Sequence, residues 1–415
     1  MKKVLSILLS VAMIVLCFAA CGKTDGDKSS TGKAANVKVG FIFLHDENST
    51  YDKNFITAAE EACKKAGVEI LKKTNISETQ ACYDAAAELV DEGCNVIFAD
   101  SFGHEPYIIQ AAKKFPEVQF LHATGTKAHT EGLSNYHNAF ASIYEGRYLA
   151  GVAAGMKLNE MISSGKITAD KAKMAYVGAY TYAEVISGYT SFYLGAKSVC
   201  PSVTMEVTFT GSWYDETAEK EAAQKLINNG CVLISQHADS MGAPTACEAA
   251  GVPNVSYNGS TVSACPNTFI VSSRIDWAPY LEYAIDCVKN GKAIDTDWTG
   301  TLSTGSVVLT DVNTKAAAEG TQAKIDEVKA ELESGKLHVF DTSAFTVTVS
   351  DSKNKNATVD ADGHLTGYKA DIDSDADNTG DTEVVSDGYF HESEKRSAPC
   401  FDVQIDGITL LDTKF

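Results

Sequence analysis

The sequence KVGFIFL, residues 38–44, is a short apolar run between polar segments. A continuous apolar run of this length is typical of a strand that is buried on both faces of a parallel sheet. The following residues 53–66, KNFITAAEEACKKA, place apolar side chains at helical spacing, and Gly67 is suited to end that helix. A buried strand followed by an amphipathic helix is the unit from which α/β folds are built.

The same alternation of strand and helix runs through most of the chain. A first half predicts further strands at 68–73, 94–100 and 118–124 and helices at 77–92 and 105–115. A helix at 141–157 leads to a second half, with strands at 173–180, 203–211, 231–239 and 253–258 and helices at 182–197, 215–229 and 242–250. Two such halves predict an α/β protein with two doubly wound, Rossmann-like lobes.

The connections between strands indicate where a ligand would bind. Right-handed crossovers bring the carboxyl ends of parallel strands to one edge of each sheet. Ligands of open α/β sheets lie outside those ends. Two lobes that face each other across such edges predict a hinge and a ligand cleft, as in solute-binding proteins that close on their ligand.

Composition excludes several classes of partner. The 415 residues carry 35 Lys and Arg against 55 Asp and Glu, a net charge of −20. Nucleic acid is excluded, because phosphate binding needs a basic surface that releases counterions. Docking on anionic lipid through a polybasic patch is excluded for the same reason.

The first residues have the order of a secretory signal. Lys2 and Lys3 precede an almost wholly apolar run at 4–20. The sequence Phe18-Ala19-Ala20-Cys21 resembles the lipobox of bacterial lipoproteins, in which the signal is cut before a cysteine that carries diacylglycerol. The resemblance implies a signal peptide at 1–20 and a lipid anchor on Cys21; an uncleaved signal anchor is the alternative. Residues 21–36 then form the anchor and a polar, flexible tether.

The cysteines indicate neither a metal site nor a full set of disulfides. There are 11 in the chain, of which nine lie in the body, an odd number that cannot all pair. No spacing suggests zinc. We expect free buried thiols, while one or two disulfides remain open.

Several segments together resemble one family. They are STYDKNF (49–55), FASIYEGRYLAGVAAG (140–155), GSWYDETAEKEAAQKLINNGCVLISQHADS (211–240), YNG (257–259) and SRIDWAPY (273–280). In this order they are similar to the basic membrane protein family of purine-nucleoside-receptor-like lipoproteins, which serve ABC transporters. The resemblance implies a type I periplasmic-binding-protein fold and a purine, nucleoside or similar heteroaromatic ligand. It also implies a protein without cofactor or metal on the extracytoplasmic face of the cell membrane, which works with an ABC permease; we expect a monomer.

A nucleobase offers two flat apolar faces and a polar edge, so its site needs aromatic rings together with amides or carboxylates. Nearly every loop after a predicted strand carries an aromatic residue beside an acid or amide. The candidate ligand-binding residues are Tyr51, Asp52, Asn54, Phe55, Asp100, Ser101, Phe102, Tyr180, Trp213, Gln236, His237, Asp239, Tyr257, Asn258, Asp276 and Trp277.

Some of these residues have a structural interpretation as well. Asp52 could only cap the following helix. Phe55 could belong to the core, and Trp213 could pack between the lobes. Glu145 and Arg147, on the helix that joins the halves, are expected to form a structural salt bridge.

The domain organisation is expected to be discontinuous. We assign residues 37–140 and 273–292 to an N-terminal lobe, and 141–272 and 293–415 to a C-terminal lobe. The latter includes a β-rich acidic extension at about 341–415, with hairpin strands around Asp362-Gly363 and a strand-rich ending at 396–411. The acidic run at 371–383 lacks the glycine and glutamate of a calcium loop, so we expect a solvated loop.

Two other functions remain open. The ligand of a binding protein could instead be riboflavin or a sugar. A secreted nucleosidase is the alternative from another class, although the sequence has no nucleophile elbow, P-loop or HExxH motif. We therefore expect no catalytic residues and no enzyme.

Overall fold

The computed structural model describes residues 36–350, 352–374 and 380–415. The expected signal peptide, the lipid anchor on Cys21 and almost all of the tether lie outside the described residues. Within the described part of the chain, no helix is both long and apolar enough to cross a membrane.

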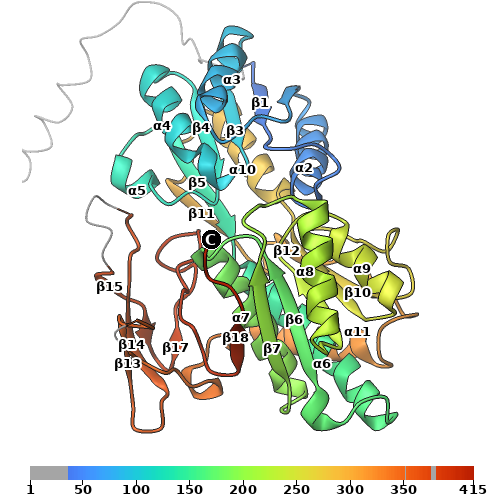
Figure 1. Cartoon of the computed structure of the whole chain (residues 1–415). Helices are drawn as coiled ribbons and strands as arrows, with labels where there is room; N and C mark the ends of the chain where they lie inside the picture. Colours follow the sequence, from blue (N-terminus) through green and yellow to red (C-terminus); the bar gives the residue numbers. More distant parts are fainter. Residues whose placement is uncertain (1–35, 351, 375–379) are drawn as a thin grey trace, which may run out of the picture. The chain divides into compact units, whose positions relative to one another are not determined.

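The first lobe is built on a parallel sheet of six strands in the order β11-β5-β4-β3-β1-β2 (Figure 1). Apolar side chains fill both of its faces. The helices α2 and α10 pack against each other, as do α3 and α4. The strands are β1 (Lys38–Ile42), β2 (Glu69–Lys73), β3 (Val96–Ala99), β4 (Gln119–Ala123), β5 (Tyr136–Ala141) and β11 (Asp297–Gly300). The helices are α2 (Thr50–Ala66), α3 (Gln80–Asp91), α4 (Glu105–Lys114), α5 (Ala128–Glu131) and α10 (Ala278–Lys289).

The second lobe has a seven-stranded sheet in the order β12-β10-β9-β8-β6-β7-β18, in which β12 alone is antiparallel to its neighbour. The strands are β6 (Lys173–Gly178), β7 (Thr204–Phe209), β8 (Leu233–Gln236), β9 (Asn254–Tyr257), β10 (Phe269–Ile275), β12 (Val307–Leu309) and β18 (Ile408–Leu410). The helices are α6 (Ile143–Ser163), α7 (Ala183–Val199), α8 (Glu216–Asn228), α9 (Gly242–Ala250) and α11 (Thr321–Glu333). The predicted pair of doubly wound α/β lobes is confirmed.

The lobe assignment from sequence differs from the sheets in two places. Asp297–Gly300 forms β11 at the edge of the first sheet, although 293–415 was assigned to the second lobe. The start of the segment 273–292 belongs to β10 of the second sheet, and only α10 packs on α2 of the first lobe. The four residues of β11, DWTG, contain no apolar run, so they carried no signal of a strand.

The helices α6 and α7 cross at unusually close range because of two glycines. A Cβ added at Gly151 would lie 2.1 Å from the carbonyl oxygen of Phe192. A Cβ added at Gly195 would lie 2.0 Å from the carbonyl oxygen of Tyr148. Only glycine permits this close contact between the backbones of the two helices.

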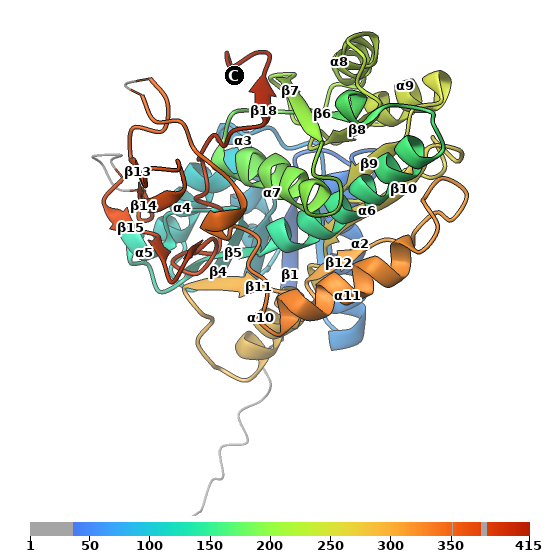
Figure 2. The same ribbon diagram turned by 90° about the horizontal axis from the view of Figure 1, so that it is seen from below.

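Residues 341–350, 352–374 and 380–407 add a β-rich layer beside α7 (Figure 2). As predicted, two strands pair as a hairpin around Asp362-Gly363, where Gly363 has φ 86°. The rings of Phe340 and Phe401 stack at 4.0 Å in the core of this layer. The strands are β13 (Ala357–Val359), β14 (Leu365–Ala370), β15 (Thr382–Glu383), β16 (Val385–Ser386) and β17 (Tyr389–Phe390). The ending at 396–411 is less regular than expected, because its regular structure is the short strand β18 (Ile408–Leu410).

The described cysteines are free buried thiols, as expected from the sequence. All nine that the structure describes are free and buried. Among the described residues, no group of three or more His, Cys, Asp or Glu side chains could hold a metal ion.

Candidate functional site

A pocket lies where the carboxyl ends of the strands of the two sheets face each other. The pocket is lined by Leu44, His45, Tyr51, Asp52, Ser101, Phe102 and Thr124 of the first lobe and by Glu184, Trp213, His237, Asp239 and Asn258 of the second.

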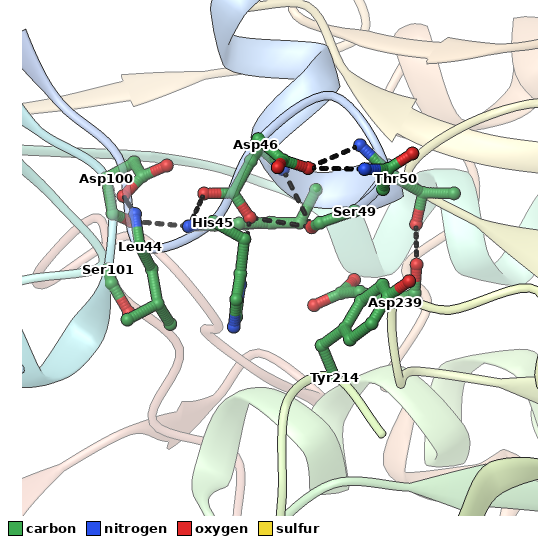
Figure 3. Close-up of polar contacts among 12 residues, drawn as sticks. Leu44, His45, Asp46, Ser49, Thr50, Asp100, Ser101, Tyr214 and Asp239 are labelled. Atoms are coloured by element: carbon green, nitrogen blue, oxygen red, sulfur yellow. Dashed lines mark hydrogen bonds and ion pairs between the residues drawn. The ribbon is translucent and has the colours of Figure 1, made fainter. Parts of the chain in front are cut away.

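The loop after β1 and the start of α2 form the first-lobe wall (Figure 3). Ser49 caps α2, and its hydroxyl accepts from the backbone N–H of Asp52. The same hydroxyl donates to Asp52 Oδ2 at 2.6 Å, while the His45 N–H donates to Asp52 Oδ1 at 2.7 Å. The N-cap of α2 is therefore Ser49, and not Asp52 as the structural alternative proposed. Asp52 instead ties the loop to the helix and lines the pocket as well.

The pKa values of two neighbouring carboxyl groups at this wall are shifted in opposite directions. Burial works to raise the pKa of Asp52, but hydrogen bonds from His45 and Ser49 outweigh it, so the pKa lies below its usual value. Burial and the negative charge of Asp52 raise the pKa of Asp100 well above its usual value. The two pKa values are therefore shifted in opposite directions, that of Asp52 toward the ionised form and that of Asp100 toward the protonated form.

The second-lobe wall contains a buried carboxyl group with a fixed partner. Asn258, which has φ 64°, donates from Nδ2 to Asp239 Oδ1 at 2.9 Å. Burial raises the pKa of Asp239 well above its usual value. Beside it, His237 Nε2 lies 3.4 Å from Glu184 Oε1, and His237 Nδ1 lies 3.2 Å from the Tyr176 hydroxyl. The wall thus presents oxygen acceptors on an ordered polar network.

Direct contacts join the lobes around the pocket. The backbone N–H and the hydroxyl of Thr50 both donate to the Asp239 carbonyl oxygen at 3.1 Å. Figure 3 shows Thr50 and Asp239 facing each other across the pocket region. The rings of His45 and Tyr214 are 5.5 Å apart, and those of Phe102 and Tyr182 are 5.3 Å apart. These contacts hold the two walls together.

The pocket suits a neutral or cationic molecule with a flat apolar face. Tyr51, Phe102 and Trp213 supply aromatic surface, whereas Asp52, Asp239 and the other polar residues supply hydrogen-bonding groups. Its lining residues include neither lysine nor arginine. A phosphate group would therefore meet carboxylates without a compensating cation.

Half of the predicted site residues line this pocket. They come from both lobes, as the rule for carboxyl ends predicts. These residues are Tyr51, Asp52, Ser101, Phe102, Trp213, His237, Asp239 and Asn258.

Other predicted residues lie behind the pocket walls. Phe55 and Trp277 stack at 4.3 Å with only 1 % of each side chain exposed, so Phe55 belongs to the core rather than to the lining. Asp100 lies beneath the first wall, where it accepts from the Leu44 N–H at 3.1 Å. Tyr257 lies behind His237, with the rings 4.6 Å apart.

The remaining predicted residues are beside or outside the pocket. Gln236 is buried and accepts from Asn254 Nδ2 at 3.0 Å. Tyr180 contacts Trp213 with the rings 5.0 Å apart, next to the lining. Asn54 and Asp276 line a separate polar groove between the lobes.

Four lining residues are not among the sixteen candidate residues. Leu44 and His45 directly follow the first strand, and Thr124 ends the strand predicted at 118–124, so the rule for carboxyl ends applies to all three. Thr124 has φ 64°, which turns the chain sharply there. Glu184 lies in the first turn of α7, where an acid is common for reasons of helix stability alone.

Arg147 does not form the expected salt bridge with Glu145. It is fully buried and donates to Ser235 Oγ at 2.8 Å and to the Ser256 carbonyl oxygen at 3.1 Å. Its guanidinium lies 5.1 Å from the centre of the Tyr257 ring. Burial raises the pKa of Glu145 to about 7. The cation thus supports the second sheet behind the pocket.

Comparisons with known proteins identify the family to which this architecture belongs. Residues 40–337 match the family described as ABC transporter substrate-binding protein, PnrA-like. A purine-binding protein of Brucella abortus is 30 % identical over 73 % of this chain and 83 % of its own length. A Haloferax volcanii protein, whose name assigns it provisionally to glucose binding for an ABC transporter, is 26 % identical over 78 % of each chain.

A solved structure of an ABC transporter solute-binding protein from Aeropyrum pernix has a TM-score of 0.62 with this chain, at 17 % identity, and covers 76 % of it and 94 % of its own chain. This likeness concerns the fold. The match over residues 40–337 includes both lobes and every residue that lines the pocket. The chain therefore belongs to the PnrA-like family of ABC transporter substrate-binding proteins.

Proposed function

We propose that this protein captures a purine nucleobase or nucleoside between its two lobes and delivers it to an ABC permease. The observation that carries the proposal is a pocket between the two sheets that has aromatic residues and carboxyl groups from both lobes and neither lysine nor arginine in its lining. The Brucella relative, named for purine binding, supports the same ligand class.

The chemistry of a purine fits the lining. The two faces of the base need flat apolar surface, which Trp213, Phe102 and Tyr51 offer. Its polar edge and the hydroxyls of a ribose need acceptors such as Asp52 and Asp239. The absence of lysine and arginine from the lining favours a nucleoside over a nucleotide, because a nucleotide adds anionic phosphate.

Closure of the lobes would provide capture and signalling without chemistry on the ligand. The bonds from Thr50 to Asp239 join the walls only when the lobes are together. A ligand that contacts both walls shifts the lobe equilibrium toward this closed form. We propose that the permease reads the closed form, that the protein is an extracytoplasmic monomer, and that Cys21 anchors it in the membrane.

Two measurements test the ligand. Mass spectrometry of small molecules carried through native purification should detect a purine or nucleoside. A thermal-shift screen should then show stabilisation by purines, since a ligand at about 100 times its Kd adds about 2.7 kcal/mol to the free energy of unfolding. No shift with any nucleobase or nucleoside would overturn the proposal.

A sugar is the second candidate. The Haloferax relative is named for glucose, and carboxylates beside an aromatic ring also suit the hydroxyls and apolar face of a sugar. Hexoses, pentoses and riboflavin therefore belong in the same screen. Incubation with adenosine tests the nucleosidase alternative, because released adenine would show bond cleavage, whereas stable bound adenosine supports binding alone.

A further inference from the structure

The segment Ile408–Phe415 extends the second lobe beyond the residues that match the family. β18 pairs in parallel with β7, with Ile408 opposite Met205 and Leu410 opposite Val207 (Figures 1 and 2). The Leu411 N–H donates to the Val207 carbonyl oxygen at 2.8 Å. The added strand covers the edge of the sheet and directs the chain toward the carboxyl end of β7.

Phe415 contacts two neighbouring loops at that end. Its main-chain oxygen accepts from the Thr181 N–H at 2.9 Å and also from the Thr181 hydroxyl. Its ring covers Gly211, where an added Cβ would lie 2.6 Å from the nearest ring carbon. Gly211 has φ 75°, so a side chain there would be strained as well as blocked. One residue thus joins the loop after β6 to the loop after β7.

Both loops carry side chains of the pocket. Thr181 lies three residues before Glu184, and Gly211 lies two residues before Trp213; Glu184 and Trp213 both line the pocket. Tyr182, which begins α7, lies 6.1 Å from Trp213 between ring centres. A shift of either loop would therefore move part of the second-lobe wall.

We propose that Ile408–Phe415 positions these two loops, with Phe415 as the positioning residue, and thereby sets the shape of the ligand pocket. The consequence for ligand choice rests on the proposed function, whereas the effect on the loops does not. A change in the segment alters the pocket without touching the ligand.

Fluorine NMR of the full chain labelled with fluorotryptophan tests the proposal without a ligand. The chain has three tryptophans, so three resonances are expected, each assigned by a Trp→Phe variant. Phe415→Ala should shift or broaden the Trp213 resonance and leave those of Trp277 and Trp298 unchanged. Phe415→Leu should restore the Trp213 resonance in large part. Leu411→Ala, which alters a side chain that is 37 % exposed on the same segment, is the matched control and should change nothing.

Ligand binding gives the second readout. If the loops adopt the pocket-forming arrangement about one tenth of the time in Phe415→Ala, affinity for adenosine falls about tenfold. A chain that ends at Asp412 should show the same loss. An unchanged Trp213 resonance in both variants would overturn the proposal, as would equal shifts of all three resonances with a lower melting midpoint. If the wild-type chain binds no purine, the proposed function fails, and the Trp213 resonance still decides the role of Phe415.

Discussion

Phe55→Ala should lower the stability of the protein, whereas Trp213→Ala should lower its affinity for the ligand. Phe55 has 1 % of its side chain exposed and contacts Trp277 and Phe98, with ring centres 4.3 and 5.5 Å away. Truncating such a core phenylalanine costs about 3–5 kcal/mol of unfolding free energy. Trp213 is only partly buried and lines the pocket. Loss of a ring that stacks on a base weakens binding by about 1–3 kcal/mol, or about 5- to 150-fold in Kd.

The stability effect converts to a measurable shift. An unfolding entropy of about 2.1 cal/mol/K per residue, applied to residues 36–415, gives roughly 0.8 kcal/mol per kelvin, so Phe55→Ala should lower the melting midpoint by about 4–6 °C. Differential scanning calorimetry measures the midpoint, and titration calorimetry with adenosine measures affinity. Trp213→Phe, which keeps an aromatic ring, is the control. The reasoning is refuted if Phe55→Ala abolishes binding at an unchanged midpoint, because Phe55 would then contact the ligand.

Three further predictions concern the same region. Thr50→Val removes the hydroxyl that donates to the Asp239 carbonyl oxygen. One hydrogen bond contributes about 1 kcal/mol, so adenosine affinity should fall about fivefold in titration calorimetry. Thr50→Ser keeps the hydroxyl and should retain affinity. Asp239→Ala should weaken nucleoside binding about two- to tenfold, because one hydrogen bond to a neutral group contributes about 0.5–1.5 kcal/mol; equal affinity of both proteins would remove Asp239 from the site. Burial raises the pKa of Glu219 to about 7, so its contribution to the free energy of unfolding is complete below about pH 4.5 and is lost as pH rises through 7. The free energy of unfolding measured in urea should therefore decline by about 3 kcal/mol over this range, and Glu219→Gln should remove that decline. An unchanged dependence on pH in the variant would contradict the assignment.

The sequence predicted the fold where local patterns and burial agree. The run at 39–44 is apolar throughout because β1 is buried on both faces, between β2 and β3. β11 escaped prediction because an edge strand of four residues needs no apolar run, and its pairing with β5 is separated by more than 150 residues in sequence. Long-range pairing of this kind leaves no local pattern.

The position of the site was predictable, but the direction of its side chains was not. The carboxyl ends of the strands indicated the loops that form the pocket. Phe55 follows such a loop, yet helix α2 turns its ring toward Trp277 in the core. Glu184 projects into the pocket from a first turn that resembles that of any stable helix. Which face of a helix meets the cleft depends on how the helix packs on the sheet.

The error at Arg147 has the same origin. Glu145 and Arg147 are two residues apart on α6, and side chains at that spacing do not face each other on a helix. Arg147 therefore points to the second sheet, where it meets Ser235, Ser256 and the Tyr257 ring. Its charge lies behind the wall that carries His237. The pocket thus keeps an acceptor-rich surface while the cation that stabilises that wall stays out of reach of the ligand.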